Sequence, residues 1–252
     1  MEPEINTTPL AVEQAPAEDY PFWKFADVAF FFAFAIPCIV MGGVTVRGIV
    51  WLLRLHVHSK ALEVIPAQFI GYGFLFLSLY FLLKMHYGRP FWQSLRWTPT
   101  RISVAREVIL GFLLAIAVAS IGALLETPDV ANPMKEMLTD RTSVLLLAIF
   151  ATTLGPVCEE LAFRGFLQPL LVKSLGPVGG ILLASVPFGL LHLAQYAWSW
   201  RHALLITLAG IAFGWMRQIS GSTKASAVMH ASYNFLFFAA LLAQGNKIPT
   251  AW

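Results

Sequence analysis

Residues 28–46 read VAFFFAFAIPCIVMGGVTV, a run without a single Asp, Glu, Lys or Arg. The run is as long as the roughly 18–20 apolar residues that an α-helix needs to cross a bilayer. It therefore predicts a membrane-spanning helix, which Pro37 and the pair Gly42-Gly43 would bend. Residues 65–83 and 108–125 form further uncharged runs of similar length, so the first helix is not an isolated anchor.

The composition of the whole chain agrees with a membrane protein. Of its 252 residues, 58% are hydrophobic and only 12% are charged, against about 25% charged residues in a typical soluble domain. The mean hydropathy is +0.69. These values exclude a soluble enzyme, a disulfide-stapled secreted domain and a disordered chain. They also disfavour an outer-membrane barrel, because its strands alternate apolar and polar residues. The expected partner is the lipid bilayer, and the net charge of +3 is attributed to cytoplasmic loops rather than to nucleic-acid binding.

The apolar runs predict an all-α, polytopic transmembrane bundle of about seven helices, with six to eight possible. The acidic N-terminus lacks the basic start of a signal peptide, so the first span is expected to stay in the mature protein. The basic loop at 84–106 is expected in the cytoplasm, which places the N-terminus inside. The predicted organisation is a polar tail at 1–24, N-terminal spans at 25–142, a catalytic core at 143–246 and a C-terminal tail at 247–252.

Three charged residues interrupt the fourth apolar run, in the sequence PVCEELAFRGFL. Glu160 and Arg164 are four residues apart and would share one face of a helix, where the guanidinium compensates the carboxylate. Glu159 lies about 100° around the helix and has no such partner. The pattern predicts that Glu160 is held ionised by its arginine, while Glu159 is available as a general base or ligand. A helix end that emerges into the headgroups would explain the same charges.

Two later spans carry polar pairs with the same four-residue spacing. Phe188 and His192 occur in VPFGLLHL, and His230 and Asn234 occur in AVMHASYNFLFF. Each pair alone fits a histidine satisfied in the core or an interhelical hydrogen bond. With Glu159, however, the two histidines could converge from three helices on one water or one metal ion.

Two mechanisms follow from that convergence. Glu159, His192 and His230 are the ligand types of zinc hydrolases, although the sequence has no HExxH. Without a metal, Glu159 and His192 would deprotonate a water, while His230 and Asn234 would stabilise the oxyanion. The sequence leaves Zn²⁺ and a metal-free glutamate mechanism open, and both predict hydrolysis of a carbonyl compound inside the bilayer.

The three motifs resemble those of a known family. EELAFR matches EExxxR, PFGLLH matches FxxxH and HASYN matches HxxxN, in the order and approximate spacing of the CPBP family. This group of CAAX-protease, bacteriocin-processing and Abi proteins includes the type II CAAX prenyl endopeptidases. The resemblance covers about residues 143–243. It implies an intramembrane endopeptidase in which Glu159 and His192 activate water, His230 and Asn234 stabilise the oxyanion, and Glu160, Arg164 and Phe188 support the site.

The resemblance also implies a peptide or protein substrate, membrane-anchored or prenylated, and an integral membrane location, which in a bacterium is the plasma (inner) membrane. The main alternative is a non-enzymatic immunity or scaffold protein that retains the fold. A transporter that uses Glu159, His192 and His230 as a proton relay is a weaker alternative. Cys158 adjoins Glu159, but a buried thiol beside carboxylates is a poor nucleophile. Cys38 and Cys158 are therefore expected to be small apolar core residues.

Overall fold

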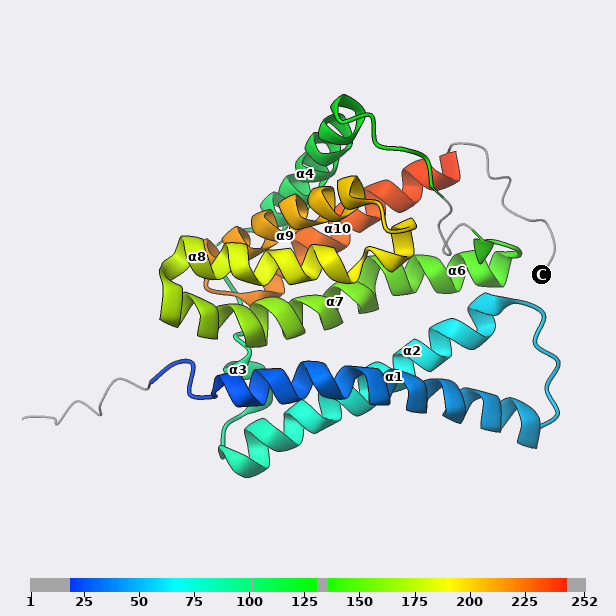
Figure 1. Ribbon diagram of the computed structural model, residues 1–252, viewed down its shortest axis with the longest axis horizontal. Coiled ribbons are helices and arrows are strands. Elements are labelled where there is room, and N and C mark those ends of the chain that lie inside the picture. Colours follow the sequence, from blue (N-terminus) through cyan, green and yellow to red (C-terminus); the bar gives the residue numbers. More distant parts are fainter. Residues whose placement is uncertain (1–18, 101, 131–135, 244–252) are drawn as a thin grey trace, which may run out of the picture.

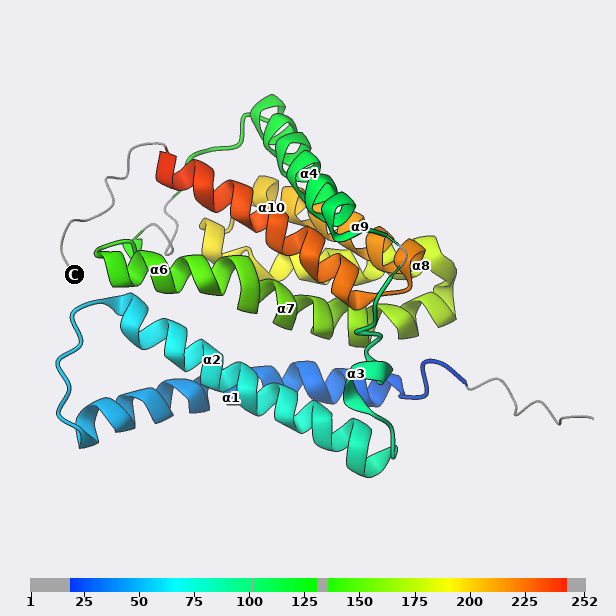
Figure 2. The ribbon, with the colours of Figure 1, turned by 180° about the vertical axis from the view of Figure 1, so that it is seen from behind.

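The computed structural model describes residues 19–100, 102–130 and 136–243, which form helices joined by loops and contain no strand. Six helical stretches in this part of the chain are long and apolar enough to cross a membrane. The prediction of an all-α polytopic bundle is therefore confirmed (Figures 1 and 2). Five of these stretches are α1 (Phe25–Leu52), α2 (Lys60–Phe81) with η1 (Leu82–His86), α4 (Val104–Leu124), α9 (Trp200–Ser220) and α10 (Thr223–Ala243).

The fourth stretch comprises two helices. At Gly176 the backbone has φ 73° and ψ 173°, a conformation that glycine adopts readily and other residues avoid. Figures 1 and 2 both show the chain reversing its direction within α8. Counted this way, the described residues contain seven long helices, as the sequence predicts. The elements of this stretch are α6 (Arg141–Ile149), η2 (Phe150–Leu154), α7 (Gly155–Glu160), η3 (Leu161–Leu167) and α8 (Gln168–Leu191).

The helices are longer than the uncharged runs that predict them. α1 continues to Leu52, so residues 47–52 extend the first helix. The short apolar run at 203–216 predicts a further span that needs flanking residues, and α9 indeed begins before this run and ends after it. Two short elements, α3 (Phe91–Ser94) and η4 (Ala194–Tyr196), lie between the spans. Residues 1–18 of the predicted N-terminal tail, and all of the C-terminal tail, lie outside the described residues.

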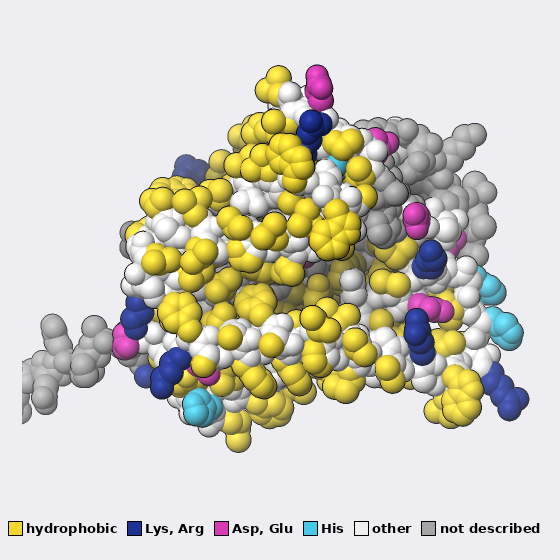
Figure 3. Space-filling model, in the orientation of Figure 1, with side chains coloured by type: hydrophobic (Ala, Val, Ile, Leu, Met, Phe, Trp, Pro, Cys, Tyr) yellow, Lys and Arg dark blue, Asp and Glu magenta, His cyan; other side chains and the backbone are white. Residues whose placement is uncertain are grey.

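α1 and α2 form a pair that lies along one side of the other helices (Figures 1 and 2). Their backbones meet at Gly42 and Gly71, where an added Cβ on Gly42 would lie 2.1 Å from the Ala67 carbonyl oxygen. Close backbone approach at small residues is typical of helix contacts in membranes. Figure 3 shows that the visible face is hollowed between this pair and the remaining helices.

The α1–α2 pair is joined to the other helices at its two ends. At one end, Trp23 and Phe31 pack with Phe166 in a buried cluster, and the Trp23 indole donates to the Phe166 carbonyl at 3.0 Å. At the other end, Ile65 packs with Leu147. The pair is therefore fixed at both ends.

Hydrogen bonds between capping side chains strengthen the end at which Ile65 packs with Leu147. Asp140 caps α6, and its carboxylate accepts from the Ser143 backbone N–H at 2.9 Å and from the Ser143 hydroxyl at 2.6 Å. The Ser143 hydroxyl also lies 2.7 Å from that of Ser59, which caps α2. The starts of α2 and α6 are thus held together by three polar side chains.

Replacing Asp140 by Ala is expected to lower the free energy of unfolding by about 1 kcal/mol, the usual contribution of an N-cap. Hydrogen bonds from Ser143 lower the pKa of Asp140. The stabilisation is therefore complete above the ordinary carboxyl pKa of about 4 and is lost as the pH falls through the lower folded-state pKa. Thermal unfolding at several pH values measures it. Asp140→Asn is the control, because it keeps a cap acceptor but should lose the acid dependence.

Candidate active site

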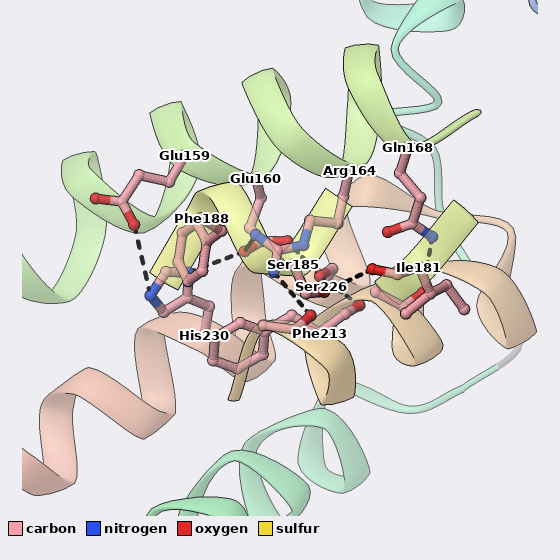
Figure 4. A network of polar contacts seen from close by, with 12 residues as sticks. Glu159, Glu160, Arg164, Gln168, Ile181, Ser185, Phe188, Phe213, Ser226 and His230 are labelled. Carbon is pink, nitrogen blue, oxygen red and sulfur yellow. Dashed lines mark hydrogen bonds and ion pairs between the residues drawn. The ribbon is translucent and has the colours of Figure 1, made fainter. Parts of the chain in front are cut away.

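One helical face brings together the charged residues of the EELAFR motif. Glu160 ends α7, Arg164 lies in η3 and Gln168 begins α8, so the three follow one another at four-residue intervals. Glu160 and Arg164 are fully buried, and the Arg164 Nη1 lies 3.0 Å from the Glu160 Oε1. Figure 4 shows both side chains pointing from this helix toward α9 and α10. The predicted i,i+4 ion pair is confirmed, and it lies in the core rather than at an emerging helix end.

Glu160 has two further partners on α10. The Ser226 hydroxyl donates to the Glu160 Oε2, and the His230 Nδ1 lies 3.0 Å from the Glu160 Oε1. A carboxylate can only accept hydrogen bonds, so the His230 Nδ1–H is the donor. Three donors around one buried carboxylate favour its ionised form. Glu160 therefore fixes the orientation of His230 and keeps a proton on its Nδ1.

Arg164 and Gln168 connect the same helix to α9. The Arg164 Nη2 donates to the Gly210 carbonyl at 2.8 Å, and the Gln168 Nε2 donates to the Gly214 carbonyl at 2.9 Å. A Cβ on Gly214 would lie 2.8 Å from the Gln168 Oε1. Two glycines four residues apart thus let α9 approach closely enough for both bonds. The guanidinium of Arg164 also lies 4.4 Å from the ring centroid of Phe188, where a cation–π attraction adds to the ion pair.

Glu159 differs from Glu160 in its exposure and in its polar partners. Its side chain is 27% exposed, and its Oε2 lies 3.8 Å from the His230 Nε2. Among the described residues, it forms no ion pair with an arginine or lysine. Since the His230 Nδ1 is committed to Glu160, the Nε2 is the atom that faces Glu159 (Figure 4). Only Glu160 of the two carboxylates is paired with Arg164, as predicted, and the use of Glu159 as a general base or ligand stays a prediction.

His192 and Asn234 make other contacts. His192 directly follows α8, its Nδ1 lies 2.8 Å from the Phe188 carbonyl oxygen, and its ring centroid lies 5.0 Å from that of Phe188. The predicted Phe188–His192 contact is confirmed. Within the described part of the chain, His192 forms no hydrogen bond or ion pair with Glu159. The His230 ring centroid lies 5.9 Å from the same phenyl ring, so both imidazoles border Phe188.

Asn234 lies one helical turn beyond His230 on α10. Its Nδ2 donates to the Ala151 carbonyl at 2.8 Å. Ala151 belongs to the π-helical segment η2, which ends at the residue before α7 begins. One N–H and the oxygen of the Asn234 amide remain for other partners. Asn234 therefore joins α10 to the helix that carries Glu159.

The zinc hypothesis requires Glu159, His192 and His230 to surround one ion. No group of three or more His, Cys, Asp or Glu side chains in the described residues is arranged to hold a metal ion. Glu159 and His230 approach each other, whereas His192 contacts only Phe188 among the groups considered above. In this arrangement the three side chains do not form a set of ligands for a metal ion.

Sequence reasoning missed several residues around the site. Ser226, His230 and Asn234 continue one four-residue series on α10, and Gln168 continues the series of Glu160 and Arg164. That spacing is the signal that would have identified both additions. Phe213 stacks on His230 at 4.3 Å with an interplanar angle of 19°. Phe213 lies outside the three motifs in the sequence, so no spacing pattern indicates it.

Tyr72 is a contribution from the N-terminal helices. It lies on α2, stacks on Phe150 with a centroid separation of 6.1 Å, and is within electrostatic range of Glu159 and Cys158. Cys38 and Cys158 are both free, the first buried and the second half-buried. Tyr72 thus connects α2 with the helix that carries Glu159.

Comparison with known proteins identifies the region that contains this site. Residues 141–236 match the family described as Type II CAAX prenyl endopeptidase Rce1-like. The match begins with α6 and ends within α10, so it includes all three motifs. No curated protein matches the chain, and neither does any solved structure. The chain is an integral membrane protein whose residues 141–236 match the Rce1-like type II CAAX prenyl endopeptidase family, in agreement with the CPBP resemblance of its motifs.

Proposed function

We propose that this protein is an intramembrane endopeptidase that hydrolyses a peptide bond with a water activated by Glu159. The observation that carries the proposal is the contrast between two adjacent carboxylates. Glu160 is fully buried and held by three donors, whereas Glu159 is partly exposed and faces the His230 Nε2 at 3.8 Å. A general base must be accessible and within reach of the proton that it removes.

The reaction follows from these positions. Glu159 accepts a proton from water, and the resulting hydroxide adds to the peptide carbonyl carbon. The His230 Nε2–H and the free amide N–H of Asn234 donate to the developing oxyanion. Glu159 then returns the proton to the leaving amine as the C–N bond breaks. His230 takes part in this step with a proton on each ring nitrogen, and Glu160 orients the ring by accepting from the Nδ1–H, as a carboxylate does in a catalytic triad.

His192 is proposed to assist Glu159 with the water, as the family resemblance implies. Its Nδ1 is engaged by the Phe188 carbonyl, which leaves the Nε2 to interact with substrate or water. Arg164 and Phe188 hold Glu160 and the two imidazoles in place. These support the site without touching the reacting atoms.

The proposed substrate is a membrane-anchored peptide or protein, of which a prenylated CAAX sequence is the first candidate. Residues 141–236 match a family of CAAX prenyl endopeptidases. A site within apolar helices is suited to a peptide whose anchor lies in the same bilayer. In a bacterium, the location would be the plasma membrane.

The test is hydrolysis by the purified full-length chain in liposomes. A farnesylated CAAX peptide and the same peptide without the prenyl group are incubated with the protein, and the products are identified by mass spectrometry. Cleavage of the prenylated peptide alone supports both the activity and the substrate class. Cleavage of both supports an endopeptidase without prenyl recognition, and a protein that cleaves neither these nor a panel of transmembrane peptides is not this enzyme.

The metal-free mechanism predicts that activity survives removal of divalent ions. Dialysis against a strong chelator is expected to change the hydrolysis rate by less than about twofold, since no step requires a Lewis acid. Zinc content is measured on the same sample by atomic emission. A loss of activity that stoichiometric Zn²⁺ restores would overturn this mechanism in favour of Zn²⁺ held by Glu159, His192 and His230.

A further inference from the structure

Two arginines converge on Tyr20 at the end of the molecule where α9 ends and α10 begins. The Arg217 Nη2 donates to the Tyr20 hydroxyl oxygen at 3.2 Å. The Arg96 guanidinium carbon lies 4.4 Å from the centroid of the Tyr20 ring. The two cations are close enough to act on each other electrostatically. One phenol therefore separates two like charges.

The surrounding backbone holds this arrangement firmly. The Arg217 Nε donates to the Thr223 hydroxyl at 3.1 Å, and that hydroxyl donates to the Leu95 carbonyl at 2.6 Å. The Thr223 N–H donates to the Arg96 carbonyl at 2.9 Å. Arg96 itself has a φ of 54°, a conformation that a residue with a side chain adopts only where its surroundings enforce it. Two segments far apart in sequence thus build one site.

The charge of Arg217 has no acidic partner among the described residues. Arg217 is only 8% exposed, and its one charged neighbour there is Arg96. The nearby carboxylates are engaged elsewhere, because Asp19 pairs with Lys173 at 2.6 Å and Asp27 accepts from the Tyr87 hydroxyl at 2.6 Å. A buried cation without a counter-ion is unfavourable, so the arrangement calls for an anion.

The donors that remain suit a phosphate group. Arg217 uses two of the five N–H groups of a guanidinium for Thr223 and Tyr20, and planar guanidinium groups bind phosphate oxygens in pairs. Burial raises the pKa of Tyr20, so the phenol keeps its proton, for which no acceptor is found in the described part of the chain. The start of α10 adds the positive end of a helix dipole.

We propose that Arg96, Arg217 and Tyr20 form a binding site for the phosphate of an anionic phospholipid. The site lies where helices end, and Arg96 belongs to a segment that also carries Trp92 and Trp97, a residue type enriched at the headgroup level of membranes. A lipid phosphate at this depth would neutralise the two guanidinium groups and fasten the segment at Tyr20 to the turn between α9 and α10. This site is separate from Glu159 and does not depend on the proposed hydrolysis.

The test is native mass spectrometry of the purified full-length chain with increasing phosphatidylglycerol. Arg96→Gln and Arg217→Lys are each expected to weaken the tightest lipid binding about tenfold, the effect of losing one charge-assisted hydrogen bond. Arg96 is exposed, so its variant should fold even where a change at Arg217 disturbs the turn. Arg54→Gln is the matched control, because Arg54 is an exposed arginine in the loop between α1 and α2, and it should bind as the wild type does.

Further arms of the experiment identify the ligand. Diacylglycerol, which has the same chains without the phosphate, should show no binding that depends on Arg96. If millimolar inorganic phosphate displaces phosphatidylglycerol and raises the unfolding temperature of the wild type alone, the phosphate site stands, with free phosphate as its occupant. Equal phosphatidylglycerol affinity in the wild type, Arg96→Gln and Arg217→Lys would refute the site.

Discussion

Replacing Glu159 by Gln is expected to reduce peptide hydrolysis about 10²–10⁴-fold while the unfolding temperature stays unchanged. The loss is that of a general base, because an amide cannot accept the proton of the attacking water. Stability is expected to persist because Glu159 is partly exposed and its ion-pair partner among the described residues, His230, lies as far as 3.8 Å away. The rate is measured on a cleaved peptide in liposomes, and unfolding is followed by intrinsic tryptophan fluorescence.

Glu160→Gln is the matched comparison, since it makes the same chemical change one residue away. It removes a buried charge from Arg164 and is expected to lower the unfolding temperature as well as the rate. Full proteolysis by Glu159→Gln would refute the mechanism. If both variants lost stability to a similar extent and the wild type had no activity, the non-enzymatic scaffold would explain the polar residues better.

Replacing Arg164 by Met is expected to lower the free energy of unfolding by about 3–5 kcal/mol. Arg164 is fully buried, and its loss leaves the Glu160 carboxylate without its cation and the Gly210 carbonyl without its donor. Removing one partner of a buried ion pair is costly because the other charge stays desolvated. Equilibrium unfolding in mixed detergent micelles measures the change.

The double variant Arg164→Met with Glu160→Leu serves as the control for that prediction. Removing both charges relieves the uncompensated carboxylate, so the double variant should be more stable than Arg164→Met alone. A single variant that unfolds like the wild type would mean that the ion pair contributes nothing to the fold. A double variant less stable than the single one would contradict the electrostatic explanation.

Much of the architecture could be predicted because its causes are local in the sequence. Uncharged runs give the spans, since the bilayer fixes how many apolar residues a helix needs. The pairing of Glu160 with Arg164, and the contact of Phe188 with His192, follow from the geometry of a single helix. The extra length of α9 also follows, because the bilayer sets a minimum that its apolar run does not reach.

The remaining features depend on which helices meet. The partner of Asn234 is a backbone carbonyl at Ala151, 83 positions away, and no local pattern indicates it. The separation of His192 from Glu159 likewise depends on how α8 packs against α7. Tyr72 comes from a helix outside the three motifs, and the division between N-terminal spans and catalytic core gave no reason to expect it.

The π-helical turns η2 and η3 lie on either side of Glu159 and Glu160. Each π-helical turn holds an additional residue compared with an α-helical turn. Deleting one residue within Leu161–Phe163 would let this turn return to α-helical geometry, but it would leave Glu160 and Arg164 three positions apart instead of four. The guanidinium would then lie at a different angle to the Glu160 carboxylate, while the helix beyond Leu167 would keep nearly the same face. The spacing across this turn is therefore a constraint on the length of the helix, and a deletion that kept every named side chain would still disturb the ion pair.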